Sequence, residues 1–368
     1  MTSRRGPGTI KSYHRSKLAT GVLSSVFVFL LLTVLVTSGL SRELADVART
    51  VSSHQIGALI VFALMLGGLQ GVLTLPFGFW SGYVLEHRYG LSSQSLGRWA
   101  WERAKGAAVG LPLGLGAAVI VYASLERFGM LWWLPAGAAF ALLSVVLARL
   151  APVVLLPIFY RLTPLEQGPL RDRVEALCRT AGLTVRGVLR FDLSKNTHKA
   201  NAAFTGIGRS RRVLLGDTLL EGFTEEEIET VVAHELGHAV HGHIARGMMT
   251  GIALSLVTLA VSSVLYRWSL EAMGFARLTD LAALPLLVLW IALLATVTSP
   301  LGHLQTRSHE RQADRYAVRM TGKKDAFVAA LRKLQTLNLA DPEPHPVVEA
   351  LFYSHPPMAK RIALVEAL

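Results

Sequence analysis

Six long stretches without an acidic or basic side chain constrain this chain more than any other feature of its sequence. Each reaches the roughly 20 residues that an α-helix needs to cross a bilayer. Because backbone groups inside a bilayer must satisfy their own hydrogen bonds, such stretches predict helices. Hydrophobic residues make up 52% of the chain and charged residues 17%, which predicts a mainly α-helical, polytopic membrane bundle. The stretches are Leu18–Leu40, Gln55–Leu85, Gly106–Leu125, Phe128–Ala148 (running on to Tyr160), Gly247–Tyr266 and Leu281–Thr306.

Lys and Arg residues between these stretches alternate between many and few along the chain. They are frequent before the first stretch and in 86–105 and 161–246, and sparse in 41–54 and 267–280. Because Lys and Arg accumulate on the cytoplasmic side, we expect both termini and 161–246 to be cytoplasmic. The net charge of +12 is then explained by basic residues that face anionic lipid headgroups. The sequence has no basic patch interleaved with aromatic residues, so we expect no nucleic-acid partner. The first stretch is longer than a signal-peptide core, so we expect an uncleaved signal-anchor.

The lengths and spacing of the stretches divide the chain into two parts. We expect an N-terminal membrane domain with four spans at 1–160 and a second domain at 161–368. The second domain would include two further spans, at about 247–266 and 281–306. Cys178 is the only cysteine, so an intramolecular disulfide is excluded.

The residues His234-Glu235-Leu236-Gly237-His238 form an HExxH pattern. On a helix, side chains four residues apart lie on one face, so both imidazoles can face one ion. Two imidazoles and one further ligand leave a tetrahedral position open, which is the arrangement of catalytic zinc sites. Zinc lowers the pKa of a water bound to it, and Glu235 lies where it can take a proton from that water as general base.

The context of the pattern argues against a chance match on a surface helix. Thr224 followed by Glu227 forms a capping box, which predicts that a helix begins just before the motif. Gly237 lies inside that helix, where glycine costs about 1 kcal/mol relative to alanine. We therefore expect another part of the chain to approach the helix backbone closely at Gly237.

A third ligand is expected just after the last apolar stretch, in the segment 307–314 (RSHERQAD). The fifth and sixth spans form a hairpin, so this segment returns to the side of the HExxH helix. Glu310 is the expected ligand, and Asp314, four residues on, can accept a hydrogen bond from a ligand histidine. His309 points about 100° away from Glu310 on a helix and ranks below it.

Between the fourth and fifth spans the pattern changes to that of a small α+β domain of the zincin type. A helix is expected at 169–181 and strands at 185–193, 201–207 and 212–215. An extended substrate can pair with an exposed edge strand of such a sheet beside the metal. Further helices are expected at 323–337 and at the C-terminus.

Several residues admit two interpretations. His241 lies on the ligand face, but the favoured interpretation places His241 and His243 as polar residues near the membrane surface. Arg149 faces either a water-filled cavity or the membrane interface. Pro76 and Pro152 are expected to break or kink their spans, as in a bundle that encloses space.

With these motifs the chain resembles the integral-membrane CAAX prenyl endopeptidase family of zinc metalloproteases, from about residue 70 onward. That family encloses its site in a chamber walled by membrane helices, and its eukaryotic members have a seventh span at the N-terminus. The matching segments are 75–77 (LPF), 84–90 (VLEHRYG), 157–165 (PIFYRLTPL), 194–206 (SKNTHKANAAFTG), HELGH at 234–238, the RxxExxAD of 307–314 and the SHPPxxxR of 354–361.

Position by position, the resemblance implies one zinc ion per chain, bound by His234, His238 and Glu310. It implies Glu235 as the base. Asp314 would support the ligands from behind.

The resemblance also implies how substrate is held. Asn201 and Ala203 would lie on the strand beside the substrate. His355 and Arg361 would stabilise the substrate carbonyl or the oxyanion, and Arg307 would support the ligand region.

The main expectation is thus a membrane-embedded zinc metalloendopeptidase acting on a peptide or protein substrate, with or without a lipid. One alternative is a broad-specificity quality-control protease that cleaves membrane proteins regardless of prenylation. A metal-binding membrane transporter is the non-enzyme alternative, but it has no use for a Glu between the two histidines.

Overall fold

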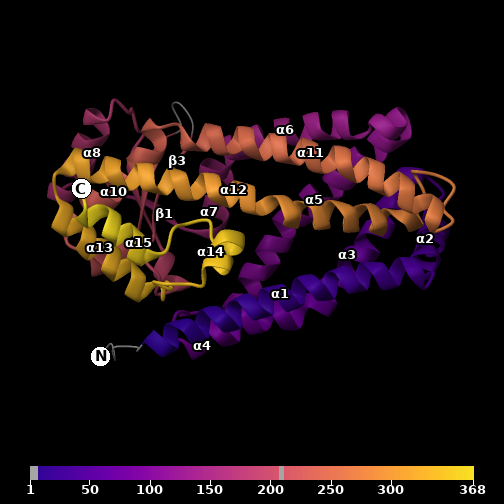
Figure 1. The fold of residues 1–368 in the computed structure, drawn as a ribbon, viewed down its shortest axis with the longest axis horizontal. Helices are drawn as coiled ribbons and strands as arrows, with labels where there is room; N and C mark the ends of the chain where they lie inside the picture. The colour runs from indigo at the N-terminus through magenta and orange to yellow at the C-terminus, as the bar shows by residue number, and fades with distance from the viewer. Residues whose placement is uncertain (1–6, 207–210) are drawn as a thin grey trace.

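A computed structural model describes residues 7–206 and 211–368. The long helices run side by side, and the sheet and shorter helices gather at one end (Figure 1). The described residues contain six helices long and apolar enough to cross a membrane, as the sequence predicted. They are α1 (Pro7–Thr37), α3 (Gln55–Phe79) continuing through η1 (Trp80–Val84) and α4 (Leu85–Arg88), α5 (Leu96–Phe128), α6 (Trp133–Leu150) continuing through η3 (Ala151–Leu155) and α7 (Leu156–Phe159), α11 (His243–Ala272) and α12 (Leu284–Thr321).

The surfaces of these helices carry large apolar side chains. Leu142, Val297 and Trp268 each expose about two thirds of their surface, at 67%, 66% and 65%. Isolated exposed apolar residues are common, but faces of them along long apolar helices suit a hydrocarbon environment. The chain is therefore a multi-pass membrane protein.

The helices depart from expectation at one place. Residues 40–51 form a short helix, α2 (Leu40–Val51), within the segment expected to be a connection. Neither proline ends its span. Pro76 lies inside α3, directly before the π-helical segment η1, and Pro152 lies inside the π-helical segment η3. Each of these spans changes from α-helical to π-helical hydrogen bonding and then continues as an α-helix.

The sheet has four strands in the order β1-β2-β4-β3. β2 pairs antiparallel with β1 and parallel with β4, and β3 pairs antiparallel with β4, which leaves β3 at one edge. Three strands were predicted, whereas β1 was not. Residue 207, at the end of one predicted strand, lies outside the described residues. The strands are β1 (Leu162–Pro164), β2 (Val188–Phe191), β3 (Ala202–Thr205) and β4 (Arg212–Gly216).

Helices pack on this sheet and form the core of the region after residue 160. Leu215, Leu219, Val232 and Leu236 are completely buried there, and each contributes about 1.5–3 kcal/mol through burial. The helices of this region are α8 (Pro169–Thr180), α9 (Asp217–Gly222), α10 (Glu225–Val240), α13 (Lys324–Leu337), α14 (Pro346–Phe352) and α15 (Met358–Glu366).

A second core joins the membrane helices at their other end, near α2 (Figure 1). Phe62 of α3, Tyr266 of α11 and Leu286 of α12 belong to this core, together with the fully buried Trp132. Because α11 and α12 contribute to this core and also carry site residues at their opposite ends, the two spans connect the membrane bundle to the sheet region rigidly.

Cys178 provides a test of the core around the sheet. It lies in α8, is 1% exposed, and burial raises the pKa of its thiol to about 11. Because the thiolate is the reactive form, we expect maleimide labelling of the folded protein at pH 7 to be at least roughly 100-fold slower than after unfolding. Mass spectrometry of the labelled protein measures both rates; equal rates would contradict this packing.

Candidate metal site and active site

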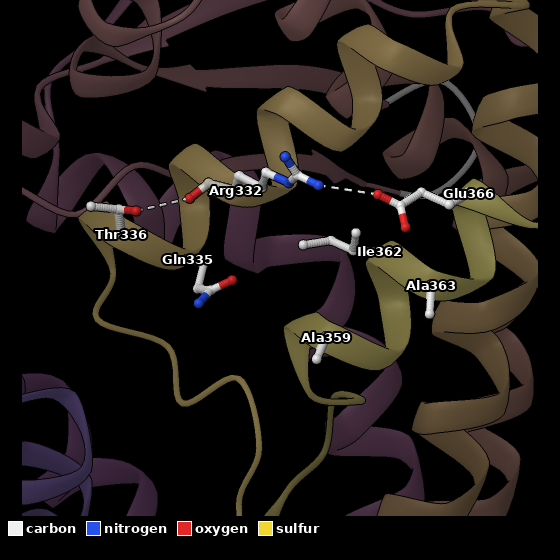
Figure 2. A pocket seen from close by; sticks show the side chains of 7 residues that line it. All are labelled: Arg332, Gln335, Thr336, Ala359, Ile362, Ala363 and Glu366. Atoms are coloured by element: carbon white, nitrogen blue, oxygen red, sulfur yellow. Dashed lines mark hydrogen bonds and ion pairs between the residues drawn. The ribbon is translucent and has the colours of Figure 1, made fainter. Parts of the chain in front are cut away.

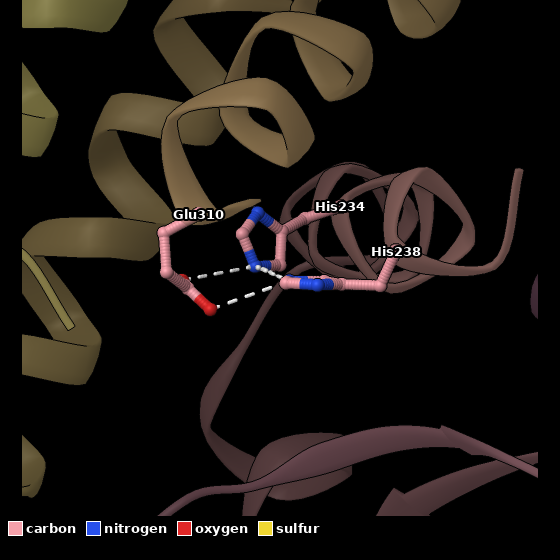
Figure 3. Close-up of side chains that lie close together, drawn as sticks. All are labelled: His234, His238 and Glu310. Carbon is pink, nitrogen blue, oxygen red and sulfur yellow. Dashed lines mark hydrogen bonds and ion pairs between the residues drawn. The ribbon is translucent and has the colours of Figure 1, made fainter. Parts of the chain in front are cut away.

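The helix α10 presents two histidines one turn apart. It begins with the predicted capping box, in which Thr224 accepts a hydrogen bond from the N–H of Glu227 and the Glu227 carboxylate accepts one from the N–H of Thr224. Such a cap stabilises a helix by about 1 kcal/mol. Nε2 of His234 and Nε2 of His238 lie 3.2 Å apart, so both rings point at one place (Figure 3).

The helix α12 lies directly against α10 at Gly237. A Cβ atom added to Gly237 would lie 3.0 Å from Cα of Ala313 and 3.2 Å from Cβ of Tyr316. Distances this short exclude a larger side chain without a shift of one helix. The close approach expected from a glycine inside the motif is thus made by α12, which carries Glu310.

Glu310 completes a group of three ligand atoms. Its Oε2 lies 3.5 Å from Nε2 of His234 and its Oε1 lies 3.3 Å from Nε2 of His238. All three ligand atoms lie within 4.8 Å of one another, and Figure 3 shows them converging. Glu310 is 4% exposed, and its Oε2 is buried with no hydrogen-bond partner. A buried oxygen without a partner is rare, and a metal ion would satisfy it, so these residues fit one.

Asp314 and Arg361 lie behind His234. Oδ1 of Asp314 is 2.9 Å from Nδ1 of His234, which turns Nε2 toward Glu310. Arg361 donates two hydrogen bonds to Asp314, at 2.9 and 2.6 Å. Burial alone would lower the pKa of His234, but the carboxylates beside its two nitrogens outweigh burial and raise it to about 9. The site therefore attracts positive charge, and metal binding must displace a proton.

His355 reaches the site from the loop between α14 and α15. Its Nε2 lies 3.4 Å from Oε1 of Glu310, and its side chain is 62% exposed. Nδ1 of His355 lies 2.9 Å from Oγ of Ser354. Arg307 is buried and donates hydrogen bonds to the carbonyls of Glu349 and Tyr353, at 3.1 and 2.6 Å. Arg307 thus fixes the loop that carries His355 and does not touch the ligands.

A cavity of about 200 Å³ opens beside the three ligand atoms. Glu235 lines it, and its Oε2 lies 3.4 Å from the N–H of Phe204 on β3. The base carboxylate therefore lies between the ligand histidines and the edge strand. Other residues lining this cavity are Asn201, Ala202, His234, Glu310, His355 and Arg361.

The edge strand divides its backbone groups between two sides. The N–H of Gly216 donates to the carbonyl of Asn201 at 2.9 Å. Because backbone groups alternate along a strand in an antiparallel pair, those of Ala203 also face β4. Those of Ala202 and Phe204 face the free edge. Asn201 and Ala202 line the cavity, whereas Ala203 packs on the other face of the sheet.

Contacts that the motifs did not indicate hold the segment before β3. Asn338 both donates to the carbonyl of Ala200 and accepts from its N–H, at 3.2 and 3.0 Å. Nζ of Lys199 lies 2.9 Å from Oε2 of Glu86, near the C-terminal end of the α3–α4 span. Burial lowers the pKa of Lys199 against the opposing effect of Glu86. Glu86 and Lys199 lie in two of the segments that match the family, 84–90 and 194–206, but neither segment indicates this contact.

The placement of His243 corrects the expectation that it is a polar residue near the membrane surface. It is 4% exposed, and its Nδ1 lies 3.1 Å from Nδ1 of His238. His309, ranked below Glu310 as a ligand, stacks on His243 instead, with ring centroids 4.0 Å apart. His241 lies further out, 5.5 Å from the ring of His243.

A separate surface pocket of about 480 Å³ lies between α13 and α15 (Figure 2). The pair of Arg332 and Glu366 crosses it at 3.1 Å, and both side chains are at least half exposed. An exposed pair of this kind contributes at most about 1 kcal/mol. The lining shares no residue with the cavity beside Glu310, so this pocket is not part of the site.

The comparisons with known proteins agree with this geometry. Residues 164–368 match the model of peptidase family M48, and residues 9–161 match that of the CAAX prenyl protease N-terminal region with five membrane helices. A CAAX prenyl protease 1 homolog of Arabidopsis thaliana is 30% identical, covering 82% of this chain and 73% of that protein. The uncharacterized metalloprotease YhfN of Bacillus subtilis is 28% identical, covering 90% and 79%.

The fold matches the crystal structure of Ste24p from S. mikatae. The TM-score is 0.85 at 24% identity, and the match covers 98% of this chain and 88% of that one. The predicted fold class is confirmed, while the enclosed chamber stays a prediction of the resemblance. The chain belongs to peptidase family M48, and it is a membrane metalloprotease of the CAAX prenyl protease type.

Proposed function

We propose that the protein is a zinc endopeptidase whose ion is held by His234, His238 and Glu310, one ion per chain. The observation that carries the proposal is the convergence of three ligand atoms within 4.8 Å around a buried oxygen that has no hydrogen-bond partner. Two imidazoles and a carboxylate are a donor set typical of catalytic zinc.

Zinc bound there would polarise the scissile carbonyl and make water acidic. Glu235 would take the proton and later deliver it to the leaving amine. Its carboxylate suits this role because it lines the cavity next to His234 and lies on the side of the edge strand. Asp314 holds the His234 ring so that its Nε2 is free for the metal.

The residues proposed for the oxyanion differ in their surroundings. His355 is largely exposed and directs Nε2 into the cavity, so it would donate to the oxygen that becomes negative. Arg361 is almost fully buried and is bound to Asp314 by two hydrogen bonds. It would contribute its positive charge from behind, since Nη1 lies 3.6 Å from Oε2 of Glu310.

A substrate segment would bind by pairing with β3. The outer edge of this strand offers the backbone groups of Ala202 and the carbonyl of Phe204, whose N–H donates to Glu235. Asn201 would contact the substrate through its side chain, and Ala203 would hold the strand on β4. Backbone pairing selects an extended peptide of any sequence, so side-chain specificity must come from elsewhere in the cavity.

We further propose that the site faces the cytoplasm and that the peptidase domain begins at residue 161. The alternation of Lys and Arg along the loops supports the first proposal. The meeting of the two family matches at 161–164 supports the second. The substrate would be a peptide or membrane protein, with or without a lipid, reached from the bilayer or the cytosol.

Replacing Glu235 with Gln should separate binding from chemistry. We expect the variant to bind one zinc ion with wild-type affinity but to cleave peptide about 100- to 10,000-fold more slowly, because an amide cannot take a proton. Metal analysis and peptide cleavage on purified protein give both values. Cleavage at the wild-type rate would show that another group is the base.

Replacing Glu310 with Gln should instead weaken zinc binding. We expect a loss of more than about 100-fold in affinity, since even residues behind a ligand are worth 10- to 100-fold. Glu366→Gln, at the exposed pair in Figure 2, is the matched control and should bind as the wild type does. Competition with a fluorescent chelator measures the zinc affinity of the wild type and of both variants. An unchanged affinity in Glu310→Gln would exclude Glu310 as a ligand.

The substrate class can be tested with paired peptides. If the protein shares the substrate class for which its CAAX prenyl protease relatives are named, it should cleave a farnesylated peptide faster than the same peptide without the lipid. A chelator should abolish cleavage of both peptides. Mass spectrometry identifies the products. Equal cleavage of the two peptides would favour the alternative of a broad-specificity quality-control protease. If neither peptide were cleaved in a chelator-sensitive reaction, the alternative of a metal-binding transporter would be favoured.

A further inference from the structure

We propose that His243 is a positioning residue that fixes the tautomer of His238, so that Nε2 of His238 is available to a metal. The proposal rests on the metal site proposed above. It extends that site by uncharged side chains, His243 and Gln312, which are hydrogen-bonded in a line behind His238 as Asp314 is behind His234. Nothing in the HExxH pattern itself requires this residue.

The contacts form a line from the ligand into α12. Nδ1 of His243 lies 3.1 Å from Nδ1 of His238, and Nε2 of His243 lies 3.2 Å from Oε1 of Gln312. Both distances fit hydrogen bonds. His243 is 4% exposed, so water does not replace these partners.

The protons in this line have one arrangement that suits metal binding. A histidine that binds a metal through Nε2 carries its proton on Nδ1. Nδ1–H of His238 must then donate to Nδ1 of His243, which accepts only if its own proton is on Nε2. That Nε2–H donates to the Gln312 carbonyl, which cannot donate in return. With its oxygen facing Nε2 of His243, as in this structure, the Gln312 amide favours this tautomer of both histidines.

Two further features hold the His243 ring in place. His309 stacks on it with an interplanar angle of 7°. His309 and Gln312 lie three residues apart on α12, so one face of that helix supplies both the stacking ring and the acceptor. Gly242, with φ of 66°, turns the chain between α10 and α11, which lets the first residue of α11 face back toward α10. A side chain at Gly242 would be strained by about 1–2 kcal/mol.

The two ligand histidines are thus supported differently. His234 has a carboxylate, Asp314, itself bound to Arg361, whereas His238 has a neutral imidazole. A second carboxylate behind His238 would bring a further negative charge into a site that already contains Glu310 and Asp314. A neutral acceptor orients the ring without that charge.

The test measures zinc affinity of the full-length protein by competition with a fluorescent chelator. His243→Phe keeps a ring that can stack on His309 but removes both nitrogens, and we expect affinity to fall about 10- to 100-fold. His243→Asn places a carbonyl oxygen near the position of Nδ1, and we expect it to recover most of that loss. Gln312→Leu removes the terminal acceptor and should give an intermediate loss.

His241→Asn is the matched control, because it changes a neighbouring histidine that does not contact His238, and its affinity should stay within about twofold of wild type. Protection of Cys178 from maleimide verifies that each variant is folded. ¹⁵N NMR of histidine-labelled, zinc-loaded protein should show His238 protonated on Nδ1.

The outcomes separate this inference from the proposed function. Wild-type protein that binds no zinc would overturn the metal site and this inference together. Zinc binding by wild type with equal affinity in folded His243→Phe would overturn the inference alone. If His243→Asn bound zinc as weakly as His243→Phe, the inference would also be overturned, because the loss of affinity would then come from altered packing and not from the missing acceptor.

Discussion

The approach of α12 to α10 at Gly237 is the contact on which the site depends. Without a side chain at this position, Ala313 and Tyr316 of the second helix lie against the backbone of the first. Glu310 and Asp314 lie on either side of this contact, and each faces a different nitrogen of His234. A larger residue at 237 would push α12 away from α10 and shift the carboxylates of Glu310 and Asp314 away from His234. The packing of the two helices therefore determines the geometry of the ligands.

The polar groups around this contact are buried, and burial makes them interdependent. Asp314 is 0% exposed and Arg361 is 7% exposed. Removing one partner of a buried ion pair costs about 3–5 kcal/mol, because the remaining charge has neither water nor a partner. Arg361 comes from the C-terminal helix α15, and Arg307 ties down the loop before it. The last segment of the chain thus completes a site that begins on α10.

The membrane helices contribute to this site through rigidity. α11 and α12 reach from the buried core that contains Trp132 to the ligands, and the stretch 309–314 of α12 carries His309, Glu310, Gln312 and Asp314. Glu86, at the end of another span, pairs with Lys199 beside the edge strand. The strand that would hold substrate is therefore attached to the bundle as well as to the sheet.

The sequence by itself determined the membrane spans, the HExxH helix with its cap, and Glu310 as the partner expected to meet it. These follow from local patterns, since apolar length, helical spacing and capping act within one segment. Only the tertiary structure decided what lies behind the ligands. Strand β1, the clamp of Asn338 on Ala200, and the line from His238 through His243 to Gln312 join residues far apart in the chain. No spacing rule encodes such contacts, because they exist only once α10, α11 and α12 have packed.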